Sequence, residues 1–527
     1  MSARSGRRLS VVRLLIATVV VGALAAGGFY GAQWWTAQAD TGSTKPWFGG
    51  YVDVTATPRY AFEEPRSSRG KNVVLSFIVA GRDGGCTPTW GAAYGLDAAA
   101  SQLDLDRRIA RLRQRGGAVA VSFGGQANKE LALTCGAPSA LAKSYDAVLR
   151  RYRADTMDLD LEGGALTDVA SSERRAKAVA ELQRRRAAAH ERLSVWVTLP
   201  VAPTGLTKEG TDAVERLLSA GVDLAGVNVM TMDYGGSLPK GVSMLEGSRR
   251  ALVETHRQLG ILYDRQKLHL SPASLWSRIG ATPMIGQNDI AGEVFGLAAA
   301  KGLNRFARQN HLARVSMWSA NRDATCGSNY VDVRVVSVAC SGVRQGGRTF
   351  TDVLGAGFRG RPTGGRLART TADPVTTPRP DVASRSPYPI WSATAAYLKG
   401  TKVTWHHNVY SAKWWTRGDL PDDPVLDSWQ TPWQLVGPVL AGDTPAPTPS
   451  LPAGTFPHWS GRAAYKTGAH VLLDGVPYQA KWWNTGSSPA ASSVDPDGSP
   501  WSQLTVAQAL AVASPSPTTT QEAVSGR

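Results

Sequence analysis

Between Trp47 and Gly346 the chain alternates short runs rich in β-branched residues with longer segments of helical periodicity. This alternation is typical of βα units, in which each strand is followed by a helix that covers the sheet. Eight such runs within roughly 300 residues predict an α/β fold, a (β/α)8 TIM barrel. A doubly wound sheet is the alternative, but no GxGxxG motif follows the first run. The expected strands are WFGGYVDV from Trp47, NVVLSFIV from Asn72, GAVAVSFGG from Gly117, TMDLDLEG from Thr156, LSVWVTLPV from Leu193, GVNVMTMDY from Gly226, KLHLSPA from Lys267 and RVSMWSAN from Arg314.

The fourth run, DTMDLDLEG from Asp155, carries acidic residues where a buried strand should be apolar. Side chains of a strand alternate between its faces, so Asp158, Asp160 and Glu162 point one way and the apolar residues between them point the other. In a barrel the carboxylates then enter the interior, and Glu162 emerges at the carboxyl end of the strand, where active sites of barrels form. Neighbouring carboxylates cannot all ionise freely, so we expect a proton donor that stays protonated near neutral pH.

Two other interpretations of this acidic run are weaker. A Ca²⁺ site is disfavoured because the alternate residues are apolar and no glycine makes the tight turn of an EF-hand loop. A chance acidic run in a buried strand would leave charges uncompensated. The run therefore favours a catalytic site.

Past Gly355 the composition changes, and an internal repeat appears between two linkers rich in Pro, Ala and Thr. WSATAAYLKGTKV at Trp391 matches WSGRAAYKTGAHV at Trp459 with a constant offset of 68, which indicates two copies of one small β-module. We expect a barrel domain over 45–355, a linker over 356–387, a first all-β module over 388–440, a linker over 441–455, a second module over 456–510 and a disordered tail over 511–527.

The N-terminus has the form of an export signal, because four arginines precede a charge-free run from Leu14 to Ala39. The run is long enough to span a bilayer as an uncleaved anchor. Ala37-Gln38-Ala39 also has the small-x-small pattern of a cleavage site. Residues 1–40 are therefore expected to be a signal peptide or a membrane anchor, with the rest of the chain outside the cytoplasm, secreted or held on the outer side of the membrane.

The cysteines agree with export. The chain has four, Cys86, Cys135, Cys326 and Cys340, with no CxxC motif and no histidine cluster suited to zinc. An even count in an exported protein suggests two disulfides. Three connectivities are open, and we favour Cys86–Cys135 with Cys326–Cys340 because each pair brackets a loop within one region.

The net charge of +16 would suit an anionic partner, but the basic residues are scattered and no nucleic-acid motif is present. We therefore expect no nucleic-acid role, and the sequence predicts neither a metal site nor a cofactor.

The acidic run resembles the DxxDxDxE motif of glycoside hydrolase family 18, the chitinases and related endo-β-N-acetylglucosaminidases. Ser122-x-Gly124-Gly125, one strand earlier, resembles the SxGG motif of that family, and Trp318 lies where the family has a tryptophan on the floor of its active site. The resemblance implies that Glu162 protonates the glycosidic oxygen and that the acetamido oxygen of the sugar acts as nucleophile. It also implies that Asp160 orients the acetamido N–H and that Asp158 holds or shares a proton with Asp160.

The sixth expected strand departs from this family. The family often has M-x-Y-D there, whereas this chain keeps Met230 and Asp233 in register but has Met232 at the tyrosine position and Tyr234 two places later. A strand end or bulge could bring either Asp233 or Tyr234 into the site, and Met230 and Met232 could equally fill the barrel. The further candidates for sugar contact are Tyr51, Asp53, Gln287 and Asn288, which could also be loop caps.

The repeated modules resemble the small carbohydrate-binding modules of the family 5/12 type. A module of about fifty residues has little core, so one or two aromatic side chains must pack inside, and the surplus can stack on sugar rings. Usually one tryptophan of each pair is core, so we expect about half of them to touch ligand. The binding candidates are Trp414, Trp415, Trp482, Trp483, Tyr410 and Tyr478.

Together these features predict an exported, monomeric, endo-acting retaining hydrolase of chitin or another N-acetylglucosamine polymer. One alternative is an endo-β-N-acetylglucosaminidase that acts on glycoproteins or a cell-wall glycan. The other is a non-catalytic lectin on an inactivated barrel, although the presence of Glu162 weighs against it.

Overall fold

The computed structural model describes residues 45–328, 335–363, 380–444, 451, 454–493 and 498–513. The chain forms two compact units, Met1–Ala372 and Asp373–Arg527, which are described separately below. The expected N-terminal signal or anchor over residues 1–40 lies outside the described residues. Within the described residues, no helix is both long enough and apolar enough to cross a membrane.

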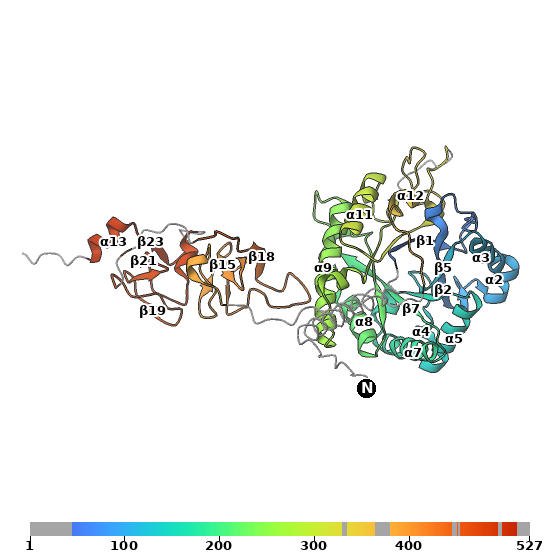
Figure 1. Ribbon diagram of the computed structural model, residues 1–527, viewed down its shortest axis with the longest axis horizontal. Coiled ribbons are helices and arrows are strands. Elements are labelled where there is room, and N and C mark those ends of the chain that lie inside the picture. Colours follow the sequence, from blue (N-terminus) through green and yellow to red (C-terminus); the bar gives the residue numbers. More distant parts are fainter. Residues whose placement is uncertain are drawn as a thin grey trace, which may run out of the picture. The chain divides into compact units, whose positions relative to one another are not determined.

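The first unit is a closed barrel of eight parallel strands inside a ring of helices (Figure 1). The barrel closes because β1 pairs in parallel with both β2 and β13. Its strands are β1 (Trp47–Asp53), β2 (Asn72–Ala80), β5 (Ala118–Gly124), β6 (Thr156–Asp160), β7 (Ser194–Ala202), β9 (Leu224–Met230), β10 (Ile279–Thr282) and β13 (Arg314–Met317). The main surrounding helices are α3 (Leu105–Gln114), α5 (Pro138–Arg151), α7 (Val169–Ala188), α8 (Lys208–Ser219), α9 (Met244–Arg265) and α11 (Leu297–Gln309). The predicted barrel is therefore confirmed.

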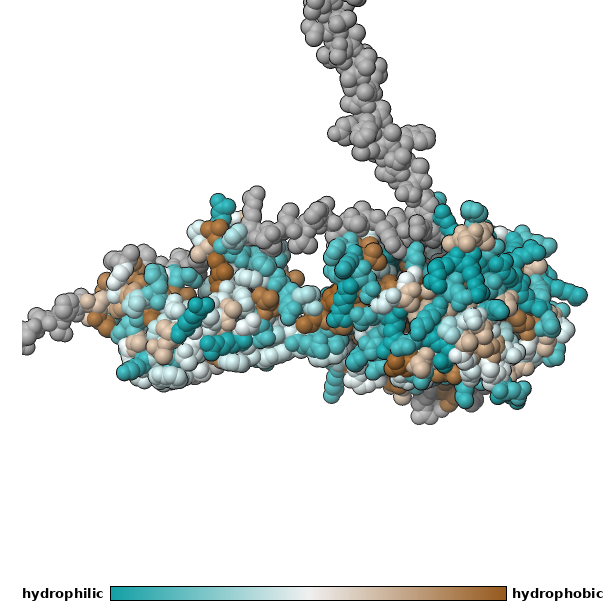
Figure 2. All heavy atoms as spheres, turned by 90° about the horizontal axis from the view of Figure 1, so that it is seen from below, coloured by the Kyte–Doolittle hydropathy of each residue, from teal (hydrophilic) through white to brown (hydrophobic). Residues whose placement is uncertain are grey.

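The helices bury one apolar stripe against the strands and turn their polar face outwards, as amphipathic helices do. In α3, for example, Leu105, Ile109 and Leu112 are buried, whereas Arg107 and Arg111 are exposed. Figure 2 shows the result on one face of the molecule, where hydrophilic residues cover most of the barrel.

The seventh strand was predicted wrongly. Lys267–Ala273 does not form a barrel strand, and the strand at that place in the barrel is β10, at Ile279–Thr282. The reason lies in a helix start, because Ser271 caps α10 (Pro272–Trp276) by accepting a hydrogen bond from Ser274 N, and Pro272 stands in the first helical turn. The strand that follows has only four residues, too few for a clear pattern.

Both predicted disulfides are present. Cys86 is bonded to Cys135 and Cys326 to Cys340, and each bond fastens loops next to the barrel. No free cysteine occurs among the described residues.

The second unit contains the same set of strands twice. In residues 388–440 β14 (Ala396–Tyr397) pairs with β17 (Thr416–Arg417), and β16 pairs with both β15 and β18. In residues 456–510 β19 (Ala464–Tyr465) pairs with β22 (Asn484–Thr485), and β21 pairs with both β20 and β23. Each strand of the second copy begins 68 residues after its counterpart, as the sequence repeat predicted. The remaining strands are β15 (Lys402–Trp405), β16 (Asn408–Ala412), β18 (Trp433–Pro438), β20 (His470–Leu473), β21 (Val476–Ala480) and β23 (Trp501–Gln503).

The aromatic residues of the two modules divide differently from the prediction. Both tryptophans of each pair are exposed, with Trp415 at 59% and Trp483 at 61%. Tyr410 and Tyr478, expected as binding candidates, are instead buried in the small cores. The cores also hold Trp433 and Trp501. Their indole N–H groups donate to the carbonyl oxygens of Asp419 and Ser487, in the loops that follow the exposed pairs. These tryptophans fill the cores, so the paired tryptophans can face solvent.

Candidate active site

A cavity of about 300 Å³ opens where the strands of the barrel end. This is the end at which barrel enzymes bind their substrates. The predicted site residues that line it are Tyr51, Asp160, Glu162, Met230, Asp233 and Trp318.

Asp158 lies below the cavity, fully buried in the barrel interior. Its Oδ2 accepts hydrogen bonds from the hydroxyls of Tyr51 at 2.8 Å and Ser122 at 2.7 Å. Its Oδ1 accepts from Thr198 Oγ1 at 2.8 Å and from an arginine of the opposite wall, Arg314 Nη1, at 2.5 Å. Four donors from four different strands therefore fill the acceptor positions of this carboxylate.

Arg314 is as completely buried as its partner. Its Nη2 donates to the Tyr51 hydroxyl at 2.9 Å and its Nε to Ser316 Oγ at 2.8 Å. The rings of Trp47 and Trp196 lie 5.0 and 5.4 Å from the guanidinium carbon, within reach of a cation–π attraction. A buried charge pair is tolerated when its polar atoms find hydrogen-bond partners, and each of the three guanidinium nitrogens of Arg314 has one.

Asp160 lies two residues after Asp158 on the same face of β6, and it lacks a comparable set of hydrogen bonds. Its Oδ1 is buried and has no hydrogen-bond partner among the described residues. Burial raises the pKa of Asp160 well above its ordinary value, and the nearby carboxylates of Glu162 and Asp158 raise it further. The surroundings of Asp160 therefore favour its protonated form more than those of an exposed carboxylate do.

The backbone of Asp160 explains the two glycines of the preceding strand. Gly125 N donates to Asp160 O at 2.9 Å. A Cβ atom on Gly124 would overlap that same carbonyl oxygen, and the φ of Gly124 is +110°. Only glycine fits such a close approach of two strands.

Glu162 lies two residues beyond the end of β6, in extended backbone just before α6 (Gly163–Thr167). The strand was expected to continue to Gly163, but Gly163 has a φ of +47° and begins the helix instead. The alternation nevertheless holds far enough for Glu162 to reach the cavity. Burial, and then the charge of Asp233, raise the pKa of Glu162 from 4.5 to about 7. A carboxylic acid with this pKa is suited to general acid–base catalysis near neutral pH.

Asp233 is held beside Glu162 by the loop that follows β10. Its Oδ1 accepts hydrogen bonds from the backbone N–H groups of Asp289 at 2.8 Å and Ile290 at 3.3 Å. Asn288 Oδ1 in turn accepts from Asp233 N at 3.3 Å. Burial and the charge of Asp289 raise the pKa of Asp233 above its ordinary value. Asn288 thus helps to fix the backbone of Asp233 without lining the cavity.

Trp318 and Phe77 form the apolar wall of the cavity. Their rings are stacked, with centroids 5.5 Å apart, and Tyr51 meets Trp318 edge to face at 6.2 Å. Stacked aromatic faces of this kind suit the apolar face of a sugar ring.

Tyr234 does not reach the cavity. Its ring is buried and its hydroxyl donates to Ser248 Oγ of α9 at 3.4 Å. Strand β9 ends at Met230 and Asp233 has a φ of +48°, so the alternation of faces that would have brought Tyr234 inwards stops before it. Met232 lines the cavity together with Met230. Asp53 is also turned away, because its Oδ1 accepts from Thr55 N and Oγ1, and Gln287 lies outside the cavity wall.

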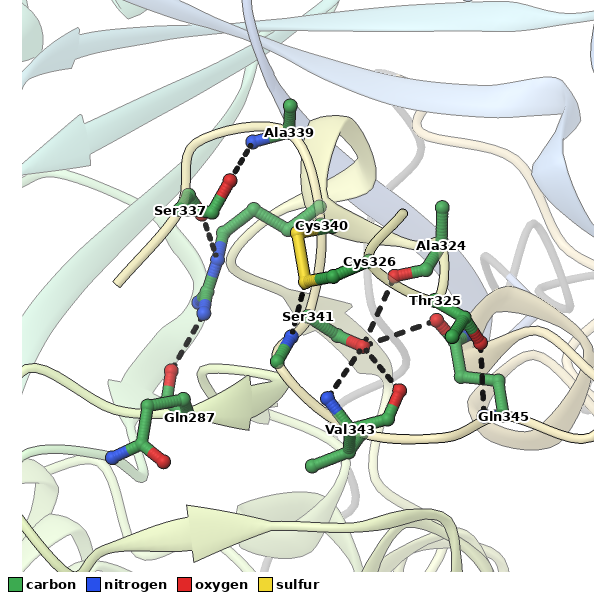
Figure 3. The surroundings of a disulfide bond; sticks show 12 residues. Gln287, Ala324, Thr325, Cys326, Ser337, Ala339, Cys340, Ser341, Val343 and Gln345 are labelled. Carbon is green, nitrogen blue, oxygen red and sulfur yellow. Dashed lines mark hydrogen bonds between the residues drawn. A yellow bond between two sulfur atoms is a disulfide. The ribbon is translucent and has the colours of Figure 1, made fainter. Parts of the chain in front are cut away.

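The Cys326–Cys340 loop supports the loop that carries Asn288 (Figure 3). Ser341 O accepts a hydrogen bond from Gln287 N at 2.8 Å. Arg322 joins the same two loops, since it donates to Gln287 O at 2.6 Å and to Ser337 O at 2.8 Å. The disulfide therefore helps to hold the loop whose backbone N–H groups position Asp233.

Some residues of the site were not predicted. The clearest case is Arg314, although the last strand carried a signal, because Arg314, Ser316 and Trp318 share one face by parity. The unpredicted residues of the cavity wall are Phe77, Gln126, Thr198, Pro200, Val201, Thr282, Met284 and Asp289. Among the described residues, no group of three or more His, Cys, Asp or Glu is placed to hold a metal ion.

The chain was compared with known proteins. No protein-family model matches it. It is 37% identical over 262 residues to a probable bifunctional chitinase/lysozyme of Escherichia coli K12, covering 48% of this chain and 28% of that protein. It is 36% identical over 256 residues to Endochitinase 11 of Metarhizium anisopliae, covering 47% of each. The chain thus spans less than half the length of both relatives, and matches of this length cannot fit within residues 373–527 alone, so they include the barrel.

Among solved structures, the chain is similar to active domain 2 of the thermostable chitinase from Pyrococcus furiosus, crystallised as catalytic-site mutants with chito-oligosaccharides. The TM-score is 0.50 at 26% identity, and the match covers 60% of this chain and 95% of that one. The barrel is thus similar in sequence to two proteins named as chitinases and similar in fold to a chitinase domain of known structure.

Proposed function

We propose that the protein cleaves the β-1,4 bonds of chitin or a related N-acetylglucosamine polymer, with retention and with the substrate supplying the nucleophile. The observation that carries this proposal is Glu162, a half-buried acid with a pKa of about 7, beside the buried and unpartnered Asp160 at the floor of an open cavity. The names of the relatives, which are chitinases, support the same substrate class.

In this mechanism a sugar ring rests on Trp318 and Phe77, and Glu162 gives its proton to the glycosidic oxygen as that bond breaks. The acetamido oxygen of the same sugar attacks its own anomeric carbon, and Asp160 accepts a hydrogen bond from the acetamido N–H while positive charge develops. Glu162, now a carboxylate, takes a proton from the water that opens the cyclic intermediate, so the configuration is retained. No step requires a cofactor.

The two modules would hold the enzyme on its polymer. Trp414 with Trp415, and Trp482 with Trp483, present flat exposed rings that can stack on sugars. We further propose that the protein is exported by its N-terminal segment, as a secreted or membrane-anchored monomer, and that it cuts within chains because its cavity opens to solvent.

The test of the catalytic proposal is the release of reducing ends from colloidal chitin by the full chain. Glu162→Gln should abolish release, while the control Glu173→Gln, on the exposed side of α7, should leave it unchanged. NMR of the first product should show the retained anomer, and an oligomer of glucosamine without acetyl groups should not be cleaved.

Three outcomes would point elsewhere. Cleavage of glycoprotein glycans but not of chitin would favour an endo-β-N-acetylglucosaminidase. Binding of chitin without cleavage by the unmutated chain would favour a lectin. Peptidoglycan belongs in the substrate panel because one relative is described as a probable bifunctional chitinase/lysozyme, and its exclusive cleavage would overturn the chitin proposal.

A further inference from the structure

The two C-terminal modules are joined by direct contacts although a Pro-rich linker separates them in sequence. Ala396 of β14 forms a parallel bridge with Ser487, which follows β22 in the other module. The bridge consists of a hydrogen bond from Ala396 N to Gly486 O and one from Ser488 N to Ala396 O at 3.0 Å. These are backbone hydrogen bonds of the kind that join strands within a sheet. We call this contact, between residues 394–396 and residues 461 and 486–488, the junction.

Side chains and glycines reinforce the junction. Trp459 packs against the core of its own module and also against the core of the first. A Cβ atom on Gly461 would lie 2.8 Å from the carbonyl carbon of Thr394, and one on Gly486 would lie 2.8 Å from the guanidinium carbon of Arg417. The two modules therefore fit most closely at Gly461, where a larger residue would meet the backbone of Thr394, whereas the Arg417 side chain beside Gly486 could move aside.

Corresponding positions of the repeat differ where the junction requires it. Gly461 is buried, whereas its counterpart Ala393 is exposed. Ala396 is buried, whereas its counterpart Ala464 is exposed. At the free ends of the unit, Ala393 and Arg462 stand where the junction has Gly461 and Thr394. The sequence therefore favours the junction between the two modules of one chain. It disfavours the same contact between modules of different chains.

The exposed tryptophan pairs are attached directly to the junction strands. Trp415 precedes β17, whose Arg417 pairs with Ala396, and Trp483 lies four residues before Ser487. Following this path at ordinary strand spacings, the Cα atoms of Trp415 and Trp483 can be no more than about 30 Å apart. The junction thus limits the separation of the two pairs, where a flexible linker alone would allow a wider range.

We propose that the two modules bind polysaccharide as one rigid two-site unit, whose partner is a solid polymer surface that offers two sugar segments at a fixed separation. This inference rests on the proposed sugar binding of the tryptophan pairs. A short soluble oligomer fills one site at a time, whereas an ordered surface fills both. Because the junction orders the two sites in advance, the second binding event costs less conformational entropy.

The variant Gly461→Leu tests the proposal, because the Cβ atom of the new side chain would lie within 2.9 Å of three atoms of Thr394 in the other module. The matched control is Ala393→Leu, the same side chain at the corresponding exposed position. Both are made in the full chain with Glu162→Gln, so that the polymer stays intact. Cysteines introduced at the exposed positions Lys399 and Thr467 take spin labels, since the four native cysteines are in disulfides.

Pulsed EPR should give a narrow distance distribution for the parent and for Ala393→Leu, and a broad one for Gly461→Leu. Binding to insoluble chitin particles should weaken about tenfold in Gly461→Leu, and binding to soluble chitotriose should not change. A broad distribution in the parent would overturn the proposal, as would unchanged chitin affinity in a variant with separated modules. If Gly461→Leu stays narrow, Thr394→Trp widens the contact from the other side, and a narrow result for both also overturns it. Absence of binding to either sugar in the parent would refute the proposed polymer, while the label distances would still decide whether the modules form a rigid unit.

Discussion

Replacing Asp233 by Asn removes the charge that helps to keep Glu162 protonated. The pKa of Glu162 rises from 4.5 to about 7, and burial is the larger cause, with Asp233 the smaller. Asp233 therefore accounts for less than half of the rise, which is roughly one pH unit at most. In Asp233→Asn the pKa of Glu162 should fall by up to that amount.

The sign of the effect on catalysis follows from the role of Glu162. In the proposed mechanism the free enzyme is active only while Glu162 is protonated, so kcat/KM should fall as the pH rises through about 7. A lower pKa in Asp233→Asn moves this basic limb to lower pH. At pH values above the pKa of Glu162, kcat/KM of Asp233→Asn should be up to about tenfold lower than that of the parent, in addition to any loss that is independent of pH.

The assay is kcat/KM on a fluorogenic chito-oligosaccharide from pH 4 to pH 10, with the full chain. The control Asp104→Asn removes a charge at an exposed position before α3, and its limb should coincide with that of the parent. A limb of Asp233→Asn that stays in place or moves to higher pH would refute the electrostatic role of Asp233, whatever happens to the maximal rate.

Three further predictions concern stability, measured by urea unfolding. The pKa of Glu162 is higher in the folded protein than its ordinary value, so this group lowers the free energy of unfolding as the pH rises from 4.5 to 7. Glu162→Gln should therefore be more stable than the parent at pH 8, by up to about 3 kcal/mol. At pH 4 the variant and the parent should be equally stable. Arg314→Met leaves the buried Asp158 carboxylate without its ion-pair partner and should cost about 3–5 kcal/mol, and adding Asp158→Asn should recover part of this loss; no recovery would contradict the pairing. Replacing Cys326 and Cys340 by Ser opens a loop with a sequence separation of 14 and should cost about 3 kcal/mol, and a loss far below that would argue against a structural role of the bond.

Local alternation was enough to predict the acidic strand. Asp158 and Asp160 face the interior because the pleat alternates, and this holds in any barrel. The same alternation places Glu162 at the cavity only because the backbone stays extended for two residues past the strand. The same argument failed for Tyr234, where a positive φ at Asp233 ended the alternation, and such a backbone turn has no signature in the pattern of apolar residues.

Contacts across the barrel or between repeats depend on register, which the sequence does not display. Arg314 lies 156 residues from Asp158, and nothing local to either residue indicates that β13 places one opposite the other. The junction between the modules is a similar case. Its traces in the sequence are Gly461 where the repeat has Ala393, and Thr394 where it has Arg462, and these differences gain meaning only once the contact is known.

The four donors on Asp158 bear on where the catalytic proton resides. A carboxylate offers about four acceptor positions, and Tyr51, Ser122, Thr198 and Arg314 occupy them. Removing any one of these donors would leave a buried acceptor position unfilled, at a cost of about 1–3 kcal/mol. The four donors therefore hold the Asp158 carboxylate in one orientation beneath Asp160, and Arg314 is the donor that does so from the opposite side of the barrel. Asp160 and Glu162 instead line the open cavity, where the proposed mechanism places the exchange of protons with the substrate.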